Sequence, residues 1–338
     1  MFAQIGEGLA ARGHTVTMLV PPGAPTAGEF SARGLAVREI PVTRTGISGV
    51  LALRRALAGL GATILVVDRA RDLRLAAGAS LLSKVSILHC NTSVAVPRDL
   101  ASRFAYRRVA LATYLSASLA ARALAAAPWK ARVPRRVIAN GIDLARFSPR
   151  ADAGAGLRER LGIGARPLLV AVSALTAEKR VDVLLAAAAL LGDARPVLAV
   201  AGEGPERPAL ESRARALALD VRWLGHVPPD DLPGWYNAAT AFVHACPVEA
   251  FGLAIAEAMA CARPVVVVDG GGVSEVVGDA GVLVAAPDPV LFAAALRGLL
   301  GDPARRRALG EAARRRAEQR FSLERLQREY ADAVESLA

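Results

Sequence analysis

Short runs of β-branched and other apolar residues alternate with alanine-rich stretches along the whole chain. This alternation is typical of parallel β-strands joined by helices that cover both faces of the sheet. The pattern therefore predicts an α/β fold. The strands that it predicts are 14–20, 35–40, 63–68, 85–89 and 136–139 in the first half, and 168–173, 197–201, 221–224, 241–245, 265–268 and 282–284 in the second.

The strand pattern is interrupted at 140–159, NGIDLARFSPRADAGAGLRE, which has an Asn-Gly turn signal and a glycine-rich tail. These features favour a linker between two domains. We expect an N-terminal Rossmann-like domain at 1–148 and a second at 149–320. The remaining residues, 321–338, are expected to form a C-terminal helix that packs back toward the N-terminal domain.

Composition limits the class of protein. The chain has 338 residues, 53% of them hydrophobic, which is enough for two ordinary cores. Its apolar runs are too short to span a bilayer, and its start lacks a basic region and a cleavage site, so we expect a cytoplasmic protein. Cys90, Cys246 and Cys261 are widely spaced and odd in number, which indicates neither a disulfide framework nor a zinc site.

Charge is unevenly distributed. Residues 1–150 hold 21 Lys and Arg against 7 Asp and Glu, a net charge of +14, while the rest of the chain holds 21 against 24, a net charge of −3. A GC-rich genome would explain the preference for arginine over lysine, but not this asymmetry. We expect an anionic partner for the basic half, either a lipid-linked acceptor at the inner face of the membrane or an acidic glycan, and no nucleic acid.

The stretch 247–277, PVEAFGLAIAEAMACARPVVVVDGGGVSEVV, carries the strongest candidate chemistry. It predicts a helix from Leu253 to Cys261, with Glu249 in the preceding loop and Glu257 one turn inside. The helix N-terminus, with Gly252 beside it, favours an anion, and the two carboxylates accept hydrogen bonds from hydroxyls. A nucleotide sugar carries both kinds of group. Lys179 adds a positive charge, although alone it would fit a solvated helix residue equally well.

Seven segments together resemble the retaining glycosyltransferases of family 4, which have the GT-B fold of two Rossmann-like domains facing across a cleft. The resemblance covers nearly the whole chain and is carried by LAARGHTVTMLV, VIANGIDLARFSP, SALTAEKRVDVLLAA, VAGEGPERPALE, VRWLGHVPPDDLPGWYNAAT, the E-x7-E motif and RPVVVVDGGGVSEVV. It implies transfer of a sugar from a nucleoside diphosphate to a lipid-linked or glycan acceptor in the synthesis of cell-envelope polysaccharides. The protein would work without a cofactor, and no D-x-D motif offers a metal site.

The resemblance also implies roles for individual residues. Glu249 would lie beside the donor sugar, Glu257 would bind the ribose hydroxyls, and Lys179 would hold the diphosphate. His89 would touch the donor sugar from the first domain, although it fits a buried or capping histidine equally well. The expected donor-binding positions also include the backbone of Ala250, Phe251, Gly252 and Leu253, together with Val227, Glu203 and Gly204.

Several glycines have an alternative, purely structural interpretation. The chain also departs from the family pattern at two places. Gly202 and Gly204 fit a tight turn, and Gly270 to Gly272 fit a loop that passes under the ligand. Ser173–Ala174 replaces the usual glycine–arginine pair, which removes a second cation from the diphosphate, and Cys246 replaces a serine. A nucleotide-sugar epimerase or hydrolase of the same fold, or a non-catalytic two-domain binding protein, are the alternative functions.

The first segment of the chain, FAQIGEGLAARGHTVTMLV, matches the family's first helix and second strand. The first domain would therefore lack its first strand and the glycine-rich loop after it. We expect a form extended upstream by these elements to be more stable and more active. The run Gly6-Glu7-Gly8 fits a dinucleotide-binding fingerprint by chance only, because the segment predicts a helix and no strand precedes it.

Overall fold

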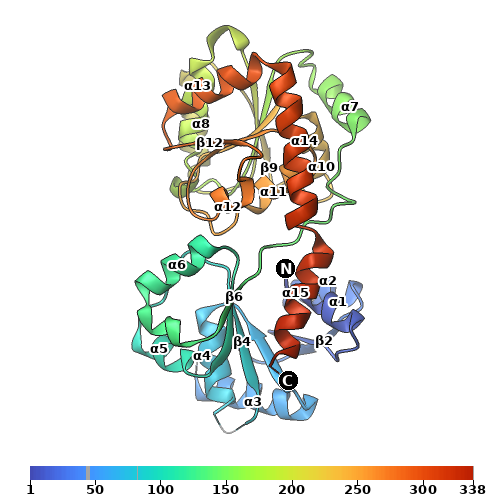
Figure 1. The fold of residues 1–338 in the computed structure, drawn as a ribbon, viewed down its shortest axis with the longest axis vertical. Coiled ribbons are helices and arrows are strands. Elements are labelled where there is room, and N and C mark those ends of the chain that lie inside the picture. The colour runs from blue at the N-terminus through green and yellow to red at the C-terminus, as the bar shows by residue number, and fades with distance from the viewer. Residues whose placement is uncertain (43–45, 82, 338) are drawn as a thin grey trace. The chain divides into compact units, whose positions relative to one another are not determined.

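A computed structural model describes residues 1–42, 46–81 and 83–337 and divides the chain into two compact units (Figure 1). Unit 1 comprises Met1–Gly141 together with the chain from Leu323 onward, and unit 2 comprises Ile142–Ser322. The chain passes between the units twice, so the last helix belongs to the same unit as the N-terminus. Both units consist of parallel strands and helices, which confirms the expected α/β fold.

Unit 1 holds two parallel sheets, one of order β1-β2 and one of order β3-β4-β5-β6. Its strands are β1 (Thr17–Val20), β2 (Ala36–Glu39), β3 (Ile64–Val67), β4 (Ser86–Asn91), β5 (Val109–Tyr114) and β6 (Arg135–Val137). Its helices are α1 (Phe2–Ala11), α2 (Thr26–Ala32), α3 (Ile47–Leu60), α4 (Ala70–Ala79), α5 (Leu100–Tyr106), α6 (Ala117–Ala126), the 3-10 helix η1 (Pro128–Arg132) and α15 (Leu323–Glu335).

The two sheets of unit 1 share a hydrophobic core. Leu19 of β1 and Leu65 of β3 both pack against one cluster of buried residues that includes Leu53 and Leu57 of α3. Both leucines are only half-buried, and their strands lie in different sheets. The expected effect of an upstream extension stays a prediction.

The sequence pattern missed strand β5. The segment VALATY lies between two alanine-rich helices, and its side chains are almost all buried. In the structure it pairs with β4 on one side and β6 on the other. A fully buried strand has no alternation of polar and apolar residues, so its neighbours in the sheet reveal it better than its own sequence does.

Helix α15 packs against α1 within unit 1 (Figure 1). The two helices approach most closely at Gly8, where an added Cβ would lie 2.5 Å from the Cβ of Gln327. Tyr330 of α15 is buried, and its hydroxyl lies 3.2 Å from that of Thr113 in β5. Gly8 therefore serves helix packing, and the fingerprint-like run Gly6-Glu7-Gly8 lies inside helix α1 as expected.

Unit 2 is built around one parallel sheet of order β12-β11-β10-β7-β8-β9. Its strands are β7 (Leu168–Val172), β8 (Val197–Ala201), β9 (Asp220–Gly225), β10 (Ala241–His244), β11 (Val265–Val268) and β12 (Val282–Val284). Its helices are α7 (Ala151–Leu161), η2 (Ala177–Lys179), α8 (Val181–Leu190), η3 (Gly192–Ala194), α9 (Arg207–Ala216), α10 (Leu232–Ala238), α11 (Leu253–Ala260), α12 (Val273–Val277), α13 (Pro289–Leu300) and α14 (Pro303–Arg320).

The second part of the predicted linker is wrong, because residues 151–161 form helix α7. Gly154 is buried in this helix, where an added Cβ would lie 2.4 Å from the backbone oxygen of Asn237 in α10. The glycine that indicated a flexible linker instead lets two helices pack closely.

Candidate functional site

Two loops at the carboxyl edge of the unit 2 sheet bring the predicted lysine and the first predicted acid together. Lys179 ends the short helix η2 after β7, and Glu249 lies in the loop between β10 and α11. Because β7 and β10 are neighbouring parallel strands, both loops leave the sheet at the same edge. The Lys179 Nζ donates a hydrogen bond of 2.6 Å to Glu249 Oε1, and each side chain is 18% exposed.

This pair is charged at neutral pH. Burial raises the pKa of Glu249, but contacts with His244 and Lys179 outweigh burial and lower that pKa to about 2. Burial likewise lowers the pKa of Lys179, while the hydrogen bond and charge of Glu249 raise it above its ordinary value. The site thus holds a lysine ammonium and a carboxylate side by side.

His244 is a further neighbour of Glu249 that the sequence did not indicate. It is the last residue of β10, it is buried, and its Nε2 lies 3.2 Å from Glu249 Oε1. The angles are not those of a hydrogen bond, so Nε2 has no hydrogen-bond partner among the described residues. Cys246, two residues further on, is buried and donates its thiol proton to the Val248 carbonyl oxygen at 3.4 Å.

The second predicted acid, Glu257, lies inside α11 as expected and has a partner in α10. Tyr236 donates a hydrogen bond of 2.8 Å to Glu257 Oε2. Burial raises the pKa of Glu257 to about 7, despite the opposing effects of this hydrogen bond and of the Arg146 charge. The acid therefore titrates near neutral pH.

The start of helix α11 supplies backbone donors. Gly252 precedes the helix with φ +94°, a left-handed conformation that favours glycine. The first amides of a helix have no acceptor within that helix, and the helix dipole favours negative charge there. Phe251 is buried with its ring 5.4 Å from that of Phe321, which fixes the loop. The N-terminus of α11 thus offers the kind of backbone amides to which anions bind.

The glycine-rich loop after β11 packs against the backbone of the loop that holds Glu249. The amide of Gly272 donates a 2.8 Å hydrogen bond to the backbone oxygen of Glu249. An added Cβ at Gly271, whose φ is +59°, would lie 2.2 Å from the same oxygen, and one at Gly270 would lie 2.3 Å from that of Pro247. These glycines are therefore required for contact between two loops.

The glycines of AGEGPE have a similar role. An added Cβ at Gly202 would lie 1.9 Å from the Ser173 backbone oxygen, and one at Gly204 would lie 2.3 Å from that of Leu175. The loop after β8 is thus held against the loop after β7. The Glu203 side chain is 62% exposed and forms an ion pair with Arg207, 3.2 Å away.

Two further positions belong to the predicted donor site, Val227 and Ala174. Val227 is half-buried just after β9. Ala174, which stands where the family usually has an arginine, is exposed, and Arg180 close by forms an ion pair of 3.0 Å with Asp182. Arg180 is thus engaged with an acid of its own helix start.

His89 lies in unit 1, within strand β4, and is buried. Its Nε2 donates a hydrogen bond of 2.8 Å to the Asp68 backbone oxygen, and its Nδ1 is buried without a hydrogen-bond partner among the described residues. Burial lowers its pKa to about 4 against the opposing effect of the hydrogen bond to Asp68, and the charge of Lys130 adds a smaller lowering. The imidazole is neutral, as expected of a buried histidine.

The sequence also gave no sign of the buried lysine beside His89. Lys130 donates a hydrogen bond of 3.1 Å to Asn91 Oδ1, and its ammonium lies 4.9 Å from the centre of the Tyr106 ring. Burial lowers its pKa to about 8. It lies in the 3-10 helix η1, and only the tertiary structure brings it to Asn91 of β4.

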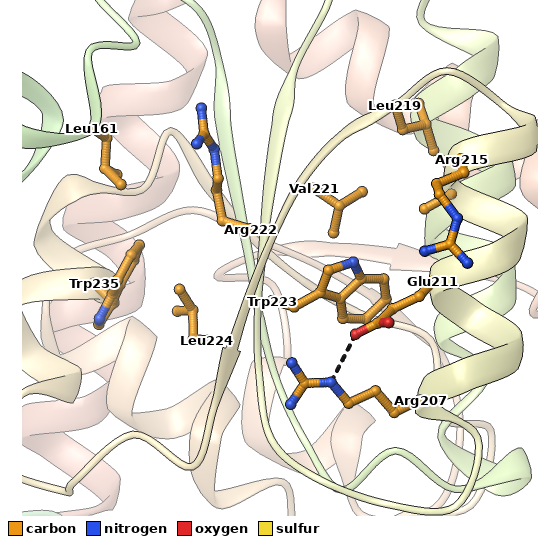
Figure 2. Close-up of a pocket in the computed structure, with 11 residues that line it drawn as sticks. Leu161, Arg207, Glu211, Arg215, Leu219, Val221, Arg222, Trp223, Leu224 and Trp235 are labelled. Carbon is orange, nitrogen blue, oxygen red and sulfur yellow. Dashed lines mark hydrogen bonds and ion pairs between the residues drawn. The ribbon is translucent and has the colours of Figure 1, made fainter.

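The hollow drawn in Figure 2 contains none of the predicted site residues. It measures about 720 Å³ and is lined by residues such as Arg207, Trp223 and Trp235. Figure 2 shows these side chains on both sides of the edge strand β9. Lys179, Glu249 and Glu257 lie elsewhere in unit 2.

Comparison with known proteins first indicates a class. Residues 157–316 match the family described as Glycosyl transferases group 1. This segment lies within unit 2 and contains every predicted site residue except His89. The match supports the expected class of protein, a glycosyltransferase.

Two curated proteins are similar to part of the chain. The chain is 35% identical over 161 residues to the GDP-mannose-dependent alpha-(1-6)-phosphatidylinositol monomannoside mannosyltransferase of Mycolicibacterium smegmatis, covering 44% of this chain and 42% of that protein. It is 39% identical over 177 residues to the D-inositol 3-phosphate glycosyltransferase of Salinispora arenicola, covering 46% and 40%. The chain thus matches less than half the length of these curated relatives.

Solved structures resemble the chain over nearly its full length. Anabaena HepE, solved in complex with UDP and glucose, has a TM-score of 0.86 at 20% identity and covers 99% of this chain and 95% of its own. Sucrose-phosphate synthase from Thermosynechococcus elongatus has a TM-score of 0.84 at 23% identity, covering 99% and 92%. These likenesses confirm the GT-B fold.

Proposed function

We propose that the protein is a retaining glycosyltransferase of family 4. It transfers a sugar from a nucleoside diphosphate to a hydroxyl of a lipid-linked or glycan acceptor. The observation that carries this proposal is the placement of the Lys179–Glu249 pair beside the N-terminus of α11, with Glu257 one turn inside that helix. A phosphate, a sugar and a ribose would each find a group of matching chemistry there.

In this proposal unit 2 binds the donor. A lysine ammonium has three N–H donors, so the hydrogen bond to Glu249 leaves Lys179 able to contact a phosphate as well. Glu257, when ionised, accepts hydrogen bonds from the ribose hydroxyls. The amides that precede α11 contact the diphosphate, and His89 of unit 1 contacts the donor sugar.

The transfer step balances without a cofactor. The acceptor hydroxyl oxygen bonds to the anomeric carbon on the face from which the diphosphate departs, so the configuration is retained. The bond between that carbon and the diphosphate oxygen breaks, and its electron pair stays with the diphosphate, which takes up the hydroxyl proton. Lys179 and the N-terminus of α11 stabilise the negative charge that develops there.

The relatives support the two substrate classes. The printed name of the mycobacterial relative includes GDP-mannose and a phosphatidylinositol mannoside, and a second relative is named for D-inositol 3-phosphate. Neighbouring structures hold UDP or UDP-glucose. We therefore propose a nucleoside diphosphate sugar as donor and an acceptor that is anionic or attached to a lipid.

We further propose that unit 1 contacts anionic lipid at the cytoplasmic face of the membrane. By the boundaries of the structure, unit 1 holds 21 Lys and Arg against 10 Asp and Glu, a net charge of +11, and unit 2 holds 21 of each, a net charge of zero. Among the described residues, no helix is both long and apolar enough to cross a bilayer. Contact would therefore be peripheral.

Helix α5 is the surface that fits such a contact. Leu100 is 80% exposed and Phe104 is 61% exposed. Arg103 is exposed on the same short helix, Arg107 is exposed directly after it, and the Arg107 guanidinium lies 5.4 Å from the centre of the Phe104 ring. Apolar side chains flanked by arginines suit the boundary between headgroups and acyl chains of an anionic bilayer.

The test is product analysis with UDP-glucose and GDP-mannose, each with and without phosphatidylinositol as acceptor. We expect a glycosylated product from one donor, formed only when acceptor is present and with the donor's anomeric configuration. Equal consumption of donor without acceptor would instead indicate an epimerase or hydrolase. Binding of donor with no turnover under any condition would indicate a binding protein.

A further inference from the structure

Three side chains of different chemistry converge at the end of β10. A ring nitrogen of His244, Cys246 Sγ and a carboxylate oxygen of Glu249 all lie within 4.8 Å of one another. His244 and Cys246 are two residues apart at the end of a strand, so their side chains lie on the same side of the chain. Both are buried, and Glu249 is half-buried.

The donor set is that of a zinc site. Imidazole nitrogen, thiolate sulfur and carboxylate oxygen are the groups that Zn²⁺ binds in proteins, and sites with three protein ligands leave a fourth position open. Ligands of one tetrahedral zinc lie roughly 3.3 to 3.7 Å apart, given bonds of about 2.0 to 2.3 Å. The His244–Glu249 separation of 3.2 Å is just below that range. Only the Cys246 sulfur has to shift, which its side-chain rotation allows.

The hydrogen bonding of the cluster also points to a ligand. His244 Nε2 is buried without a hydrogen-bond partner among the described residues. A buried polar atom without a partner costs free energy, which a metal bond would recover. The Cys246 thiol has only a weak hydrogen bond, of 3.4 Å, to the Val248 carbonyl oxygen.

We propose that His244, Cys246 and Glu249 form a binding site for Zn²⁺ that competes with Lys179 for the Glu249 carboxylate. On binding, Cys246 releases its proton to solvent and its sulfur bonds to the metal. The Lys179 ammonium, now 2.6 Å from Glu249 Oε1, is displaced by the divalent charge. If the proposed function holds, the metal removes both groups from the donor site and inhibits transfer.

Binding of cobalt alone tests the site without any assay of transfer. Co²⁺ added to the full chain should give the charge-transfer absorption of a cobalt–thiolate bond, and Zn²⁺ should abolish it. Cys246→Ser and His244→Gln should each weaken binding at least tenfold. Lys179→Met should strengthen it, because the competing cation is removed. Cys90→Ala and Cys261→Ala, which change cysteines outside the cluster, should bind as the parent does.

The absence of a cobalt–thiolate band from the parent protein, or its persistence in Cys246→Ser, would overturn the site. Circular dichroism shows which variants fold, and Glu249→Gln provides a third substitution should one of the others fail to fold. Equal binding by the parent and Lys179→Met would overturn the competition. A protein that binds cobalt as described and transfers no sugar supports the metal site and contradicts only the proposed function.

Discussion

Lys179 and Glu249, 70 residues apart in the sequence, form an ion pair of 2.6 Å at the carboxyl edge of the unit 2 sheet. The pair exists because β7 and β10 are neighbours and the loops after them face each other. It places a cation and a carboxylate next to the amides at the start of α11. The stability and the proposed donor binding of unit 2 both depend on this arrangement.

The first prediction concerns acid stability. The pKa of Glu249 is depressed from 4.5 to about 2, so the pair stabilises the native state above pH 4.5 and loses this effect as pH falls toward 2. Glu249→Gln, which leaves Lys179 without its carboxylate, should destabilise the protein by about 1 to 3 kcal/mol at pH 7. Urea unfolding at several pH values should show the difference between parent and variant shrinking as pH falls. A difference that stays constant down to the acid limit would contradict the assignment.

The second prediction concerns Glu257, whose pKa is raised from 4.5 to about 7. A raised carboxyl pKa means that the native state is favoured below pH 4.5 and is progressively disfavoured as pH rises to 7, by about 3 kcal/mol at most. Glu257→Gln should remove this loss of stability. The melting temperature of the variant should therefore vary less with pH than that of the parent protein. Identical pH profiles of melting temperature for the two proteins would contradict the raised pKa of Glu257.

Ionisation of Glu257 should also govern donor binding, since only the carboxylate accepts hydrogen bonds with both oxygens. Affinity for the nucleoside diphosphate should therefore rise through pH 7 in the parent protein and not in Glu257→Gln. Calorimetric titration of both proteins with UDP and GDP at several pH values measures this affinity.

The third prediction concerns the loop behind Glu249. Gly271→Ala should displace that loop, because its Cβ would lie 2.2 Å from the Glu249 backbone oxygen at a left-handed φ of +59°. We expect a loss of at least 1 kcal/mol in stability together with weaker nucleotide binding. Gly234→Ala is the matched control, since Gly234 lies in α10 with nothing within 4 Å of an added Cβ. Equal effects of the two substitutions would show that the loop contact is unimportant.

The fourth prediction concerns the membrane. Changing Leu100 and Phe104 of α5 to serine should reduce sedimentation with anionic liposomes, and added salt should reduce it in the parent protein. Val290→Ser, which changes an exposed valine of unit 2, should have no effect. Equal recovery with neutral and anionic liposomes would remove the proposed contact.

The pattern of apolar runs predicts eleven of the twelve strands in the part of the chain that the structure describes, because parallel sheets need continuous buried segments bounded by turns. It failed at β5, whose VALATY segment lies between two alanine-rich stretches. It also failed at α7, whose glycines suggest a linker in the sequence and allow close helix packing in the fold. In both cases the deciding information lies in neighbours distant in the sequence.

The candidate site likewise contains residues that the sequence predicts and residues that only the structure reveals. Glu249, Glu257 and Lys179 were predicted from a motif and its resemblance, and the structure brings Glu249 and Lys179 together. Tyr236 and His244 touch these acids from neighbouring elements, and nothing in their local sequence indicated it. The order of strands in the sheet decides the Lys179–Glu249 contact, and a single sequence does not display that order.

The most direct measurement of the central claim is the affinity for UDP and GDP of the parent protein, Lys179→Met and Lys84→Met. Lys84 is exposed in unit 1 and serves as the matched control. A hydrogen bond to a charged group contributes about 1.5 to 3 kcal/mol, so Lys179→Met should bind the preferred nucleotide at least about tenfold more weakly by titration calorimetry. Lys84→Met should bind as the parent does. Equal affinity in all three proteins, or no binding of either nucleotide by the parent, would contradict the assignment of this edge of unit 2 as the donor site.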